Sequence, residues 1–125
     1  MQAQNRKVLL IGLHPAVVDY SLVPGMDATK LWAGLNEEEN RLQQLGYDAQ
    51  WCLTDLGETA ESVVLERLRQ KEYDCILIGA GVRTLAAHFL LFEKLINIVH
   101  EHAPRAKLCF NTRPTDTVQA VQRWI

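Results

Sequence analysis

The spacing of apolar residues changes repeatedly along the chain, and each change marks a new secondary-structure element. Residues 8–12 and 75–79 are short, unbroken apolar runs, which are typical of strands buried on both faces. Residues 47–53 alternate between apolar and polar positions, and this pattern indicates a strand at the edge of a sheet. A fourth strand is predicted at residues 107–111. The two unbroken runs therefore belong at the centre of a sheet, with the other two strands at its edges.

Helical spacing fills the segments between the strands. Asp27 is the predicted N-cap of a helix that reaches about Leu45 and is stopped by Gly46. The predicted buried face of this helix carries Leu31, Leu35, Leu42 and Leu45. Three further helices are predicted at residues 58–71, 85–102 and 114–125, and Pro114 opens the last of them.

Four strand–helix units in succession predict an α/β fold with a parallel sheet and right-handed crossovers. With the unbroken apolar strands in the middle, the strand order becomes 2-1-3-4. This order resembles the doubly wound, flavodoxin-like (Rossmann-like) class of three-layer α/β/α sandwiches, without a fifth strand. A chain of 125 residues has the size of one domain, so residues 1–125 are predicted to form a single flavodoxin-like domain.

Composition and charge exclude several classes of protein. The net charge of -2 provides no basic surface for nucleic acid, and no apolar run approaches the roughly 20 residues of a membrane span. Cys52, Cys75 and Cys109 are odd in number, lack zinc-site spacing and lie within apolar runs. We therefore expect a cytoplasmic protein with buried thiols and with no metal, cofactor, nucleic-acid or membrane partner.

A ligand site is expected at one edge of the sheet. In open parallel sheets, ligands bind at the carboxyl ends of the strands where the winding reverses, which here lies between the first and third strands. Residues 14–26 form an unusually long loop at this place, predicted to be either a lid over a site or a flap at an interface. Ser21 lies near the tip of this loop, and Asn111 follows the fourth strand on the same rim.

The segment after the third strand is a candidate anion site. Gly79 and Gly81 let the backbone approach a ligand closely, and Arg83 and Thr84 stand beside them. Together they could hold a phosphate, a sulfate or a carboxylate. The alternative is a tight strand-to-helix turn with a solvated arginine.

Two residues are candidates for catalysis on the same rim. His14 is the candidate general acid or base, because histidine exchanges protons near neutral pH. Asp55 is the acidic residue proposed to assist it, and Asp19 and Glu58 could orient it as well. The alternative for His14 is an ordinary hydrogen bond within its loop.

Two of the predicted helices carry residues whose role is packing or contact with solvent. The predicted helix over residues 85–102 has an apolar arc wider than one sheet face requires, which predicts either contacts with neighbouring helices or a homodimer through this helix. His88 in its first turn is either a core histidine or a site residue beneath the rim. The acidic residues 37–39 are predicted to form a solvated face.

The strand order also resembles that of response-regulator receiver domains and flavodoxins. Receivers need acids after the first strand and a phospho-accepting aspartate at the end of the third, but residues 12–14 and 79–81 provide neither. Residues 13–17 likewise lack the hydroxyl-rich phosphate loop of flavodoxins. Through residues 24–27, 55–59, 78–84 and 110–112 the chain resembles a group of small bacterial proteins. That resemblance implies a compact fold in a bacterial cytoplasm and no particular activity.

Three hypotheses about function follow. The leading one is a noncatalytic flavodoxin-like module for protein interaction or for binding a small anionic ligand at the rim. The alternative is a small enzyme acting on a carboxylated or phosphorylated metabolite, in which Arg83 and the amides of residues 79–81 anchor the anion while His14 moves a proton with help from Asp55. The third is a degenerate receiver-like signalling domain that dimerises through a helix face.

Overall fold

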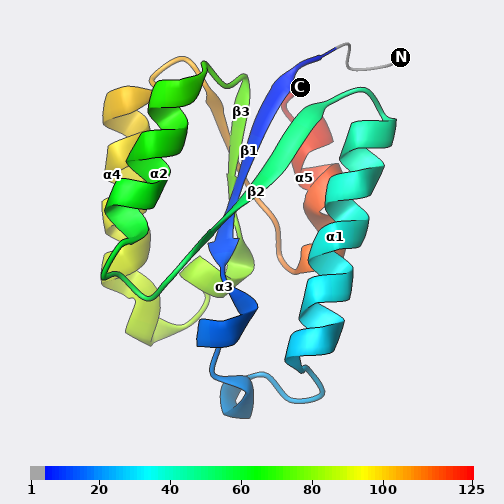
Figure 1. Cartoon of the computed structure of the whole chain (residues 1–125), viewed down its shortest axis with the longest axis vertical. Helices are drawn as coiled ribbons and strands as arrows, with labels where there is room; N and C mark the ends of the chain where they lie inside the picture. The colour runs from blue at the N-terminus through cyan, green and yellow to red at the C-terminus, as the bar shows by residue number, and fades with distance from the viewer. Residues whose placement is uncertain (1–4) are drawn as a thin grey trace.

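Four parallel strands form the central layer of the protein (Figure 1). The computed structural model describes residues 5–125. Its strands are β1 (Lys7–Leu13), β2 (Asp48–Thr54), β3 (Cys75–Ile78) and β4 (Lys107–Phe110). They lie in the order β2-β1-β3-β4 and every neighbouring pair is parallel, which confirms the predicted sheet.

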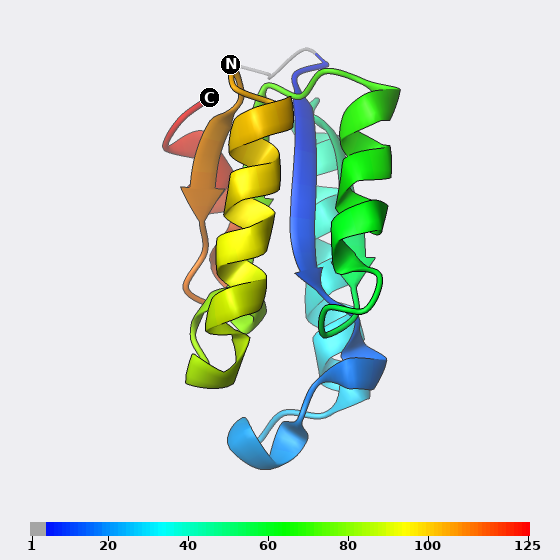
Figure 2. The same ribbon diagram turned by 90° about the vertical axis from the view of Figure 1, so that its left-hand side faces the viewer.

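Helices cover both faces of this sheet and complete the predicted α/β/α sandwich. Helices α1 (Ala28–Gln44) and α5 (Thr117–Gln122) lie on one face, and α2 (Ala60–Gln70) and α4 (Phe89–His102) lie on the other (Figure 1). The short helix α3 (Ala80–Arg83) follows β3 directly. Figure 2 shows that the loop between β1 and α1 extends beyond the carboxyl ends of the strands.

The central strands bury side chains on both faces, and each face has its own core. In β1, Leu9 and Ile11 pack with residues of α2 and α4, whereas Val8 and Leu10 pack with residues of α1 and α5. All four side chains are at most 1% exposed. This two-sided burial is the reason why an unbroken apolar run marks a central strand.

The ends of α1 are determined by its capping residues. The Asp27 carboxylate accepts a hydrogen bond of 2.8 Å from the Lys30 amide, and Gly46 adopts a φ of +98°, which favours glycine. Leu42 is buried as predicted, but the expectation for Leu45 is wrong, because its side chain is 38% exposed. Leu45 is the C-cap residue, where the chain already turns away from the sheet.

The predicted start of the third long helix is wrong. Helix α4 begins at Phe89, after a 3₁₀ turn at Ala86–His88, and the chain forms the additional helix α3 directly after β3. The reason is the burial of Val82, which is 0% exposed and packs in the core beneath α2 and α4. The chain therefore coils immediately after the strand and has to reverse before α4 can start.

The wide apolar arc of α4 packs largely within the molecule. Leu91, Leu95 and Val99 are buried, and Phe92 is one of the half-buried side chains that pack against the same core. Two side chains at the start of the helix remain exposed, Phe89 by 58% and Leu90 by 66%. Phe89 and Leu90 are the large apolar side chains of α4 that stay exposed.

Side chains from both helix layers cover the outer edge of β2. The Glu39 carboxylate accepts a hydrogen bond of 2.8 Å from the Trp51 amide, and Gln43 donates one of 2.9 Å to the Ala49 carbonyl. Arg67 of α2 donates one of 3.2 Å to the Trp51 carbonyl. These contacts occupy backbone groups that would otherwise be open to a further strand.

Glu38 contradicts the prediction of a solvated acidic face. It is 2% exposed, its Oε1 accepts a hydrogen bond of 3.3 Å from the Val118 amide, and its Oε2 accepts one of 2.7 Å from Arg41. Because Val118 lies in the first turn of α5, this carboxylate joins α1 to a helix 80 residues away.

The thiols are buried as predicted. Cys52, Cys75 and Cys109 are free, and the sulfur atoms of Cys75 and Cys109 lie 3.4 Å apart between β3 and β4. Within residues 5–125, no helix combines the length and the apolar character needed to cross a membrane.

Candidate functional site

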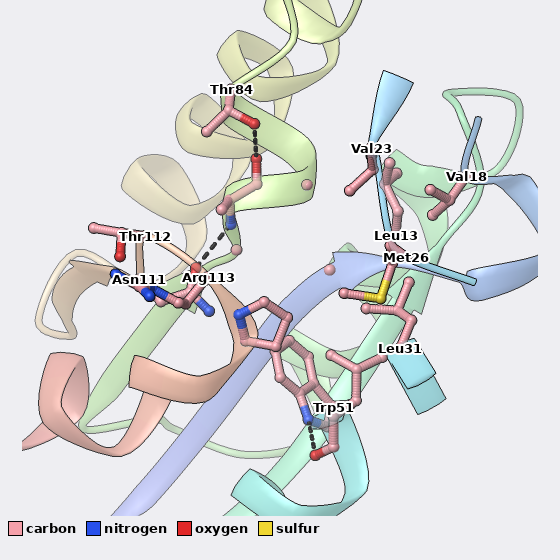
Figure 3. A pocket seen from close by; sticks show the side chains of 16 residues that line it. Leu13, Val18, Val23, Met26, Leu31, Trp51, Thr84, Asn111, Thr112 and Arg113 are labelled. Carbon is pink, nitrogen blue, oxygen red and sulfur yellow. Dashed lines mark hydrogen bonds between the residues drawn. The ribbon is translucent and has the colours of Figure 1, made fainter. Parts of the chain in front are cut away.

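A cavity of about 280 Å³ opens at the carboxyl edge of the sheet, where the winding reverses between β1 and β3 (Figure 3). This is the place at which the fold predicts a ligand site. Sixteen residues line it: Gly12, Leu13, Val18, Val23, Met26, Leu31, Leu35, Trp51, Gly79, Ala80, Gly81, Thr84, Asn111, Thr112, Arg113 and Pro114.

One wall of the cavity is apolar. The loop between β1 and α1 contributes Val18, Val23 and Met26, and the first half of α1 contributes Leu31 and Leu35. Figure 3 shows the loop side chains grouped on one side of the cavity, opposite the residues that follow β3 and β4. The long loop therefore supplies apolar surface to the site rather than polar groups.

The indole of Trp51 forms part of the same wall and is held firmly. Its Nε1 donates a hydrogen bond of 2.9 Å to the Leu35 carbonyl. A Cβ atom at Gly12 would lie only 3.1 Å from Cζ3 of the indole, so the glycine leaves the room that this ring occupies. The sequence pattern did not identify Trp51 as a site residue, because an edge-strand tryptophan ordinarily packs under a helix.

The opposite wall is polar and follows the ends of β3 and β4. Thr84, Asn111, Thr112 and Arg113 line it (Figure 3). Thr84 donates a hydrogen bond of 2.8 Å from its hydroxyl to the Ala80 carbonyl. The Thr84 and Thr112 hydroxyls and the Asn111 amide already take part in hydrogen bonds within the protein, so the surface of the cavity is mainly apolar.

Asn111 holds this polar wall together. It is 3% exposed, and its Oδ1 accepts a hydrogen bond of 2.8 Å from the Ala80 amide. Its Nδ2 donates one of 2.9 Å to the Thr117 hydroxyl. The side chain thus connects the end of β4 to α3 and α5. It also accepts the hydrogen bond of the first amide of α3, which the sequence analysis had predicted to bind an anion.

Arg113 is the one charged residue among the sixteen that line the cavity. In the described part of the chain its guanidinium forms no ion pair. The nearby Asp116 carboxylate accepts hydrogen bonds from the Thr112 hydroxyl and from the amides of Thr112 and Arg113. Partial burial raises the pKa of Asp116, but these hydrogen bonds, together with the positive charge of the nearby Arg113, outweigh it and hold that pKa below its ordinary value.

Arg83, the predicted anion anchor, does not line the cavity. Its guanidinium donates to the Ile78 carbonyl at 3.0 Å and also to the Asn111 carbonyl, and it lies over the Phe110 ring at 5.2 Å. Burial lowers the pKa of Arg83, and the charge of Asp116 acts in the opposite direction. These contacts join the ends of β3 and β4, so Arg83 acts within the scaffold of the site.

The polar residues of the long loop bond to the loop itself. His14 Nδ1 accepts a hydrogen bond of 3.0 Å from the Ala16 amide, and its ring meets Trp32 edge-to-face at 5.2 Å. The Ser21 hydroxyl donates one of 2.6 Å to Asp19. Neither His14 nor Ser21 lines the cavity. The structure thus gives both residues the role of ordering the loop.

Asp55 lies outside the cavity as well and organises the turn before α2. Its carboxylate accepts hydrogen bonds from the Thr59 hydroxyl at 2.7 Å and from the Gly57 amide at 3.0 Å. These bonds hold the pKa of Asp55 below its ordinary value, with the Thr59 hydroxyl as the largest cause. No hydrogen bond joins Asp55 to His14 within the described residues, so the structure does not bring the two catalytic candidates together.

Replacing Asp55 with asparagine is expected to reduce the loss of stability in acid. The pKa of this carboxyl is lowered in the folded protein, so its contribution is complete above the unfolded pKa of about 4 and is lost as the pH falls through the folded value. Melting temperatures between about pH 7 and pH 2 should therefore fall less steeply for Asp55→Asn than for the natural protein.

The exposed Glu58, which follows three residues later in the turn, provides the control. Glu58→Gln should keep the natural slope. A slope that Asp55→Asn leaves unchanged would show that the Thr59 and Gly57 hydrogen bonds do not favour the ionised form.

The remaining predicted site residues lie where expected. Gly79, Gly81 and Thr84 line the cavity together with Asn111. His88 lies just outside, and its Nδ1 is 3.0 Å from the Gly81 carbonyl. Sequence reasoning selected Arg83 because it stands beside Gly79 and Gly81, and it did not select Arg113, which has no such neighbours.

No family model matches the chain, and no significant match was found among the curated proteins. Within residues 5–125, no group of three or more histidine, cysteine or acidic side chains could hold a metal ion. Fold and cavity together define a doubly wound α/β domain with a mainly apolar cavity at its switch point.

Proposed function

We propose that this protein is a noncatalytic binding module that holds a small anionic ligand in the cavity at the carboxyl edge of its sheet. The observation that carries the proposal is the charge of the lining. Sixteen residues surround the cavity, and Arg113, a cation without an ion pair in the described chain, is the charged one. A guanidinium in this position favours a carboxylate or another anion.

The other hypotheses find less support in the placement of side chains. An enzyme would need His14 near the anion, but its Nδ1 bonds to Ala16 and its ring lies against Trp32 outside the cavity. Protein interaction and the homodimer through α4 would use Phe89 and Leu90, and the mass of the protein in solution tests that prediction. The cytoplasmic setting belongs to the proposal and rests on three buried, unpaired cysteines.

Arg113→Ala is expected to weaken anion binding by about tenfold or more, because a charge-assisted hydrogen bond contributes roughly 1.5–3 kcal/mol. The measurement is a thermal-shift screen of the full chain with small anions, including inorganic phosphate, acetate and phenylacetate. We expect at least one anion to raise the melting temperature by mass action, and this increase should shrink in Arg113→Ala.

Arg69, an exposed arginine on α2 away from the cavity, is the matched control. Arg69→Ala should keep the full ligand-induced increase. Gly81→Leu gives a second test, because a Cβ at Gly81 meets no atom within 4 Å and a larger side chain would fill the cavity of a folded protein. Binding that survives both Arg113→Ala and Gly81→Leu would place the ligand elsewhere and refute the proposal.

A further inference from the structure

We infer that the ligand is a small aromatic monocarboxylate whose ring packs against the loop and Trp51 while its carboxylate faces Arg113. This inference rests on the proposed function and specifies its ligand. It follows from the size of the cavity, from the character of its two walls and from the number of anion-binding groups that are free.

The size of the cavity limits the ligand. A volume of 280 Å³ holds about nine waters, at about 30 Å³ for each. A ligand of roughly ten non-hydrogen atoms fits this space on the same scale. Flavins and dinucleotides are several times larger, so most of such a cofactor would lie outside this cavity.

The apolar wall requires an apolar body on the ligand. Leu13, Val18, Val23 and Leu31 face the cavity together with Met26 and Trp51 (Figure 3). An inorganic anion or acetate would leave this wall in contact with water, whereas a ring would bury it at a gain of roughly 25 cal/mol for each Å². The fixed indole and the Met26 thioether both make favourable contacts with aromatic rings.

The polar wall favours a carboxylate over a phosphate. Phosphate sites in such folds use several backbone amides at the start of a helix. Here α3 has only four residues, and Asn111 already accepts the hydrogen bond of the Ala80 amide. A single guanidinium, that of Arg113, matches the planar geometry and the single charge of a carboxylate.

The test is calorimetric titration of the full chain with four matched probes: phenylacetate, its neutral analogue phenylacetamide, acetate and inorganic phosphate. We expect phenylacetate to bind at least about tenfold more tightly than each of the others, since only it satisfies both walls. Arg113→Ala should reduce the affinity for phenylacetate to that for phenylacetamide.

The loop provides a pair of variants that test the apolar half of the site. Met26→Gln places a polar amide in the apolar wall and should weaken phenylacetate at least about tenfold without weakening acetate. Leu22→Gln changes a residue that is 55% exposed on the same loop and outside the lining, and it should leave the affinity unchanged.

The outcomes separate this inference from the proposed function. If acetate or inorganic phosphate binds as tightly as phenylacetate and depends on Arg113, the proposed function stands and the aromatic ligand is refuted. If phenylacetamide binds as tightly as phenylacetate, the cavity binds apolar molecules and both are refuted. If none of the probes binds, the aromatic carboxylate is refuted, and the thermal-shift screen alone decides the proposed function.

Discussion

Glu38→Ala is expected to lower the free energy of unfolding by about 3 kcal/mol, whereas the neighbouring change Glu37→Ala leaves it within about 0.5 kcal/mol. Glu38 is 2% exposed and accepts the hydrogen bond of the Val118 amide, so alanine would leave that amide buried without a partner. Glu37 lies on the exposed side of the same helix. Urea unfolding followed by circular dichroism measures both variants.

Glu38→Gln separates the hydrogen bond from the charge. Its side-chain carbonyl can still accept from Val118, so it should recover part of the stability that alanine loses. The buried carboxylate would not be the contact that joins α1 to α5 if alanine at position 38 proved as harmless as alanine at position 37.

Gly79→Ala is expected to lower the free energy of unfolding by about 2 kcal/mol. A Cβ at this position would lie 3.2 Å from the Ile11 carbonyl oxygen, which accepts the Gly79 amide at 2.8 Å. Backbone on the central strand cannot move aside as a flexible side chain can. The loss of stability therefore comes from the close contact between the new Cβ and the Ile11 carbonyl. Backbone strain does not contribute, since any residue can adopt the φ of -71° at Gly79.

Gly81→Ala is the matched control for this change. Gly81 lies two residues further along, and a Cβ there meets no atom within 4 Å. Within helix α3 the alanine should be neutral or stabilise the protein by up to about 1 kcal/mol. Thermal unfolding of the two variants side by side checks the contrast, and equal costs at both glycines would contradict the close contact with Ile11.

Gly79 is also one of the residues that support the cavity. Gly79 keeps β3 close to β1 at the cavity floor, and Arg83 and Asn111 tie the ends of β3 and β4 together. The polar wall is therefore part of the rigid sheet edge. The apolar wall comes largely from the loop of residues 14–26, which is ordered by short contacts such as the 2.6 Å hydrogen bond from the Tyr20 hydroxyl to the Pro15 carbonyl.

Sequence reasoning identified the edge of the sheet but only part of the site. It placed Gly79, Gly81, Thr84 and Asn111 there because they follow strands whose carboxyl ends share one rim, and all four line the cavity. It selected Arg83 where the structure presents Arg113 to the cavity. The position of Arg83 beside the two glycines suggested an anion anchor, but its guanidinium donates to the carbonyls of residues 78 and 111 instead.

The sequence by itself determined the class of fold, the order of the strands and the edge of the sheet at which the cavity opens. These features follow from local spacing, because an unbroken apolar run needs cover on both faces and parallel strands all end at one rim. Only the tertiary structure decided that Glu38 is buried, that Trp51 and the loop form an apolar wall, and that Arg113 is among the residues that line the cavity. Such features depend on contacts between residues that are far apart in the sequence, such as the hydrogen bond between Glu38 and Val118, which are 80 residues apart. The local spacing of apolar residues does not predict those contacts.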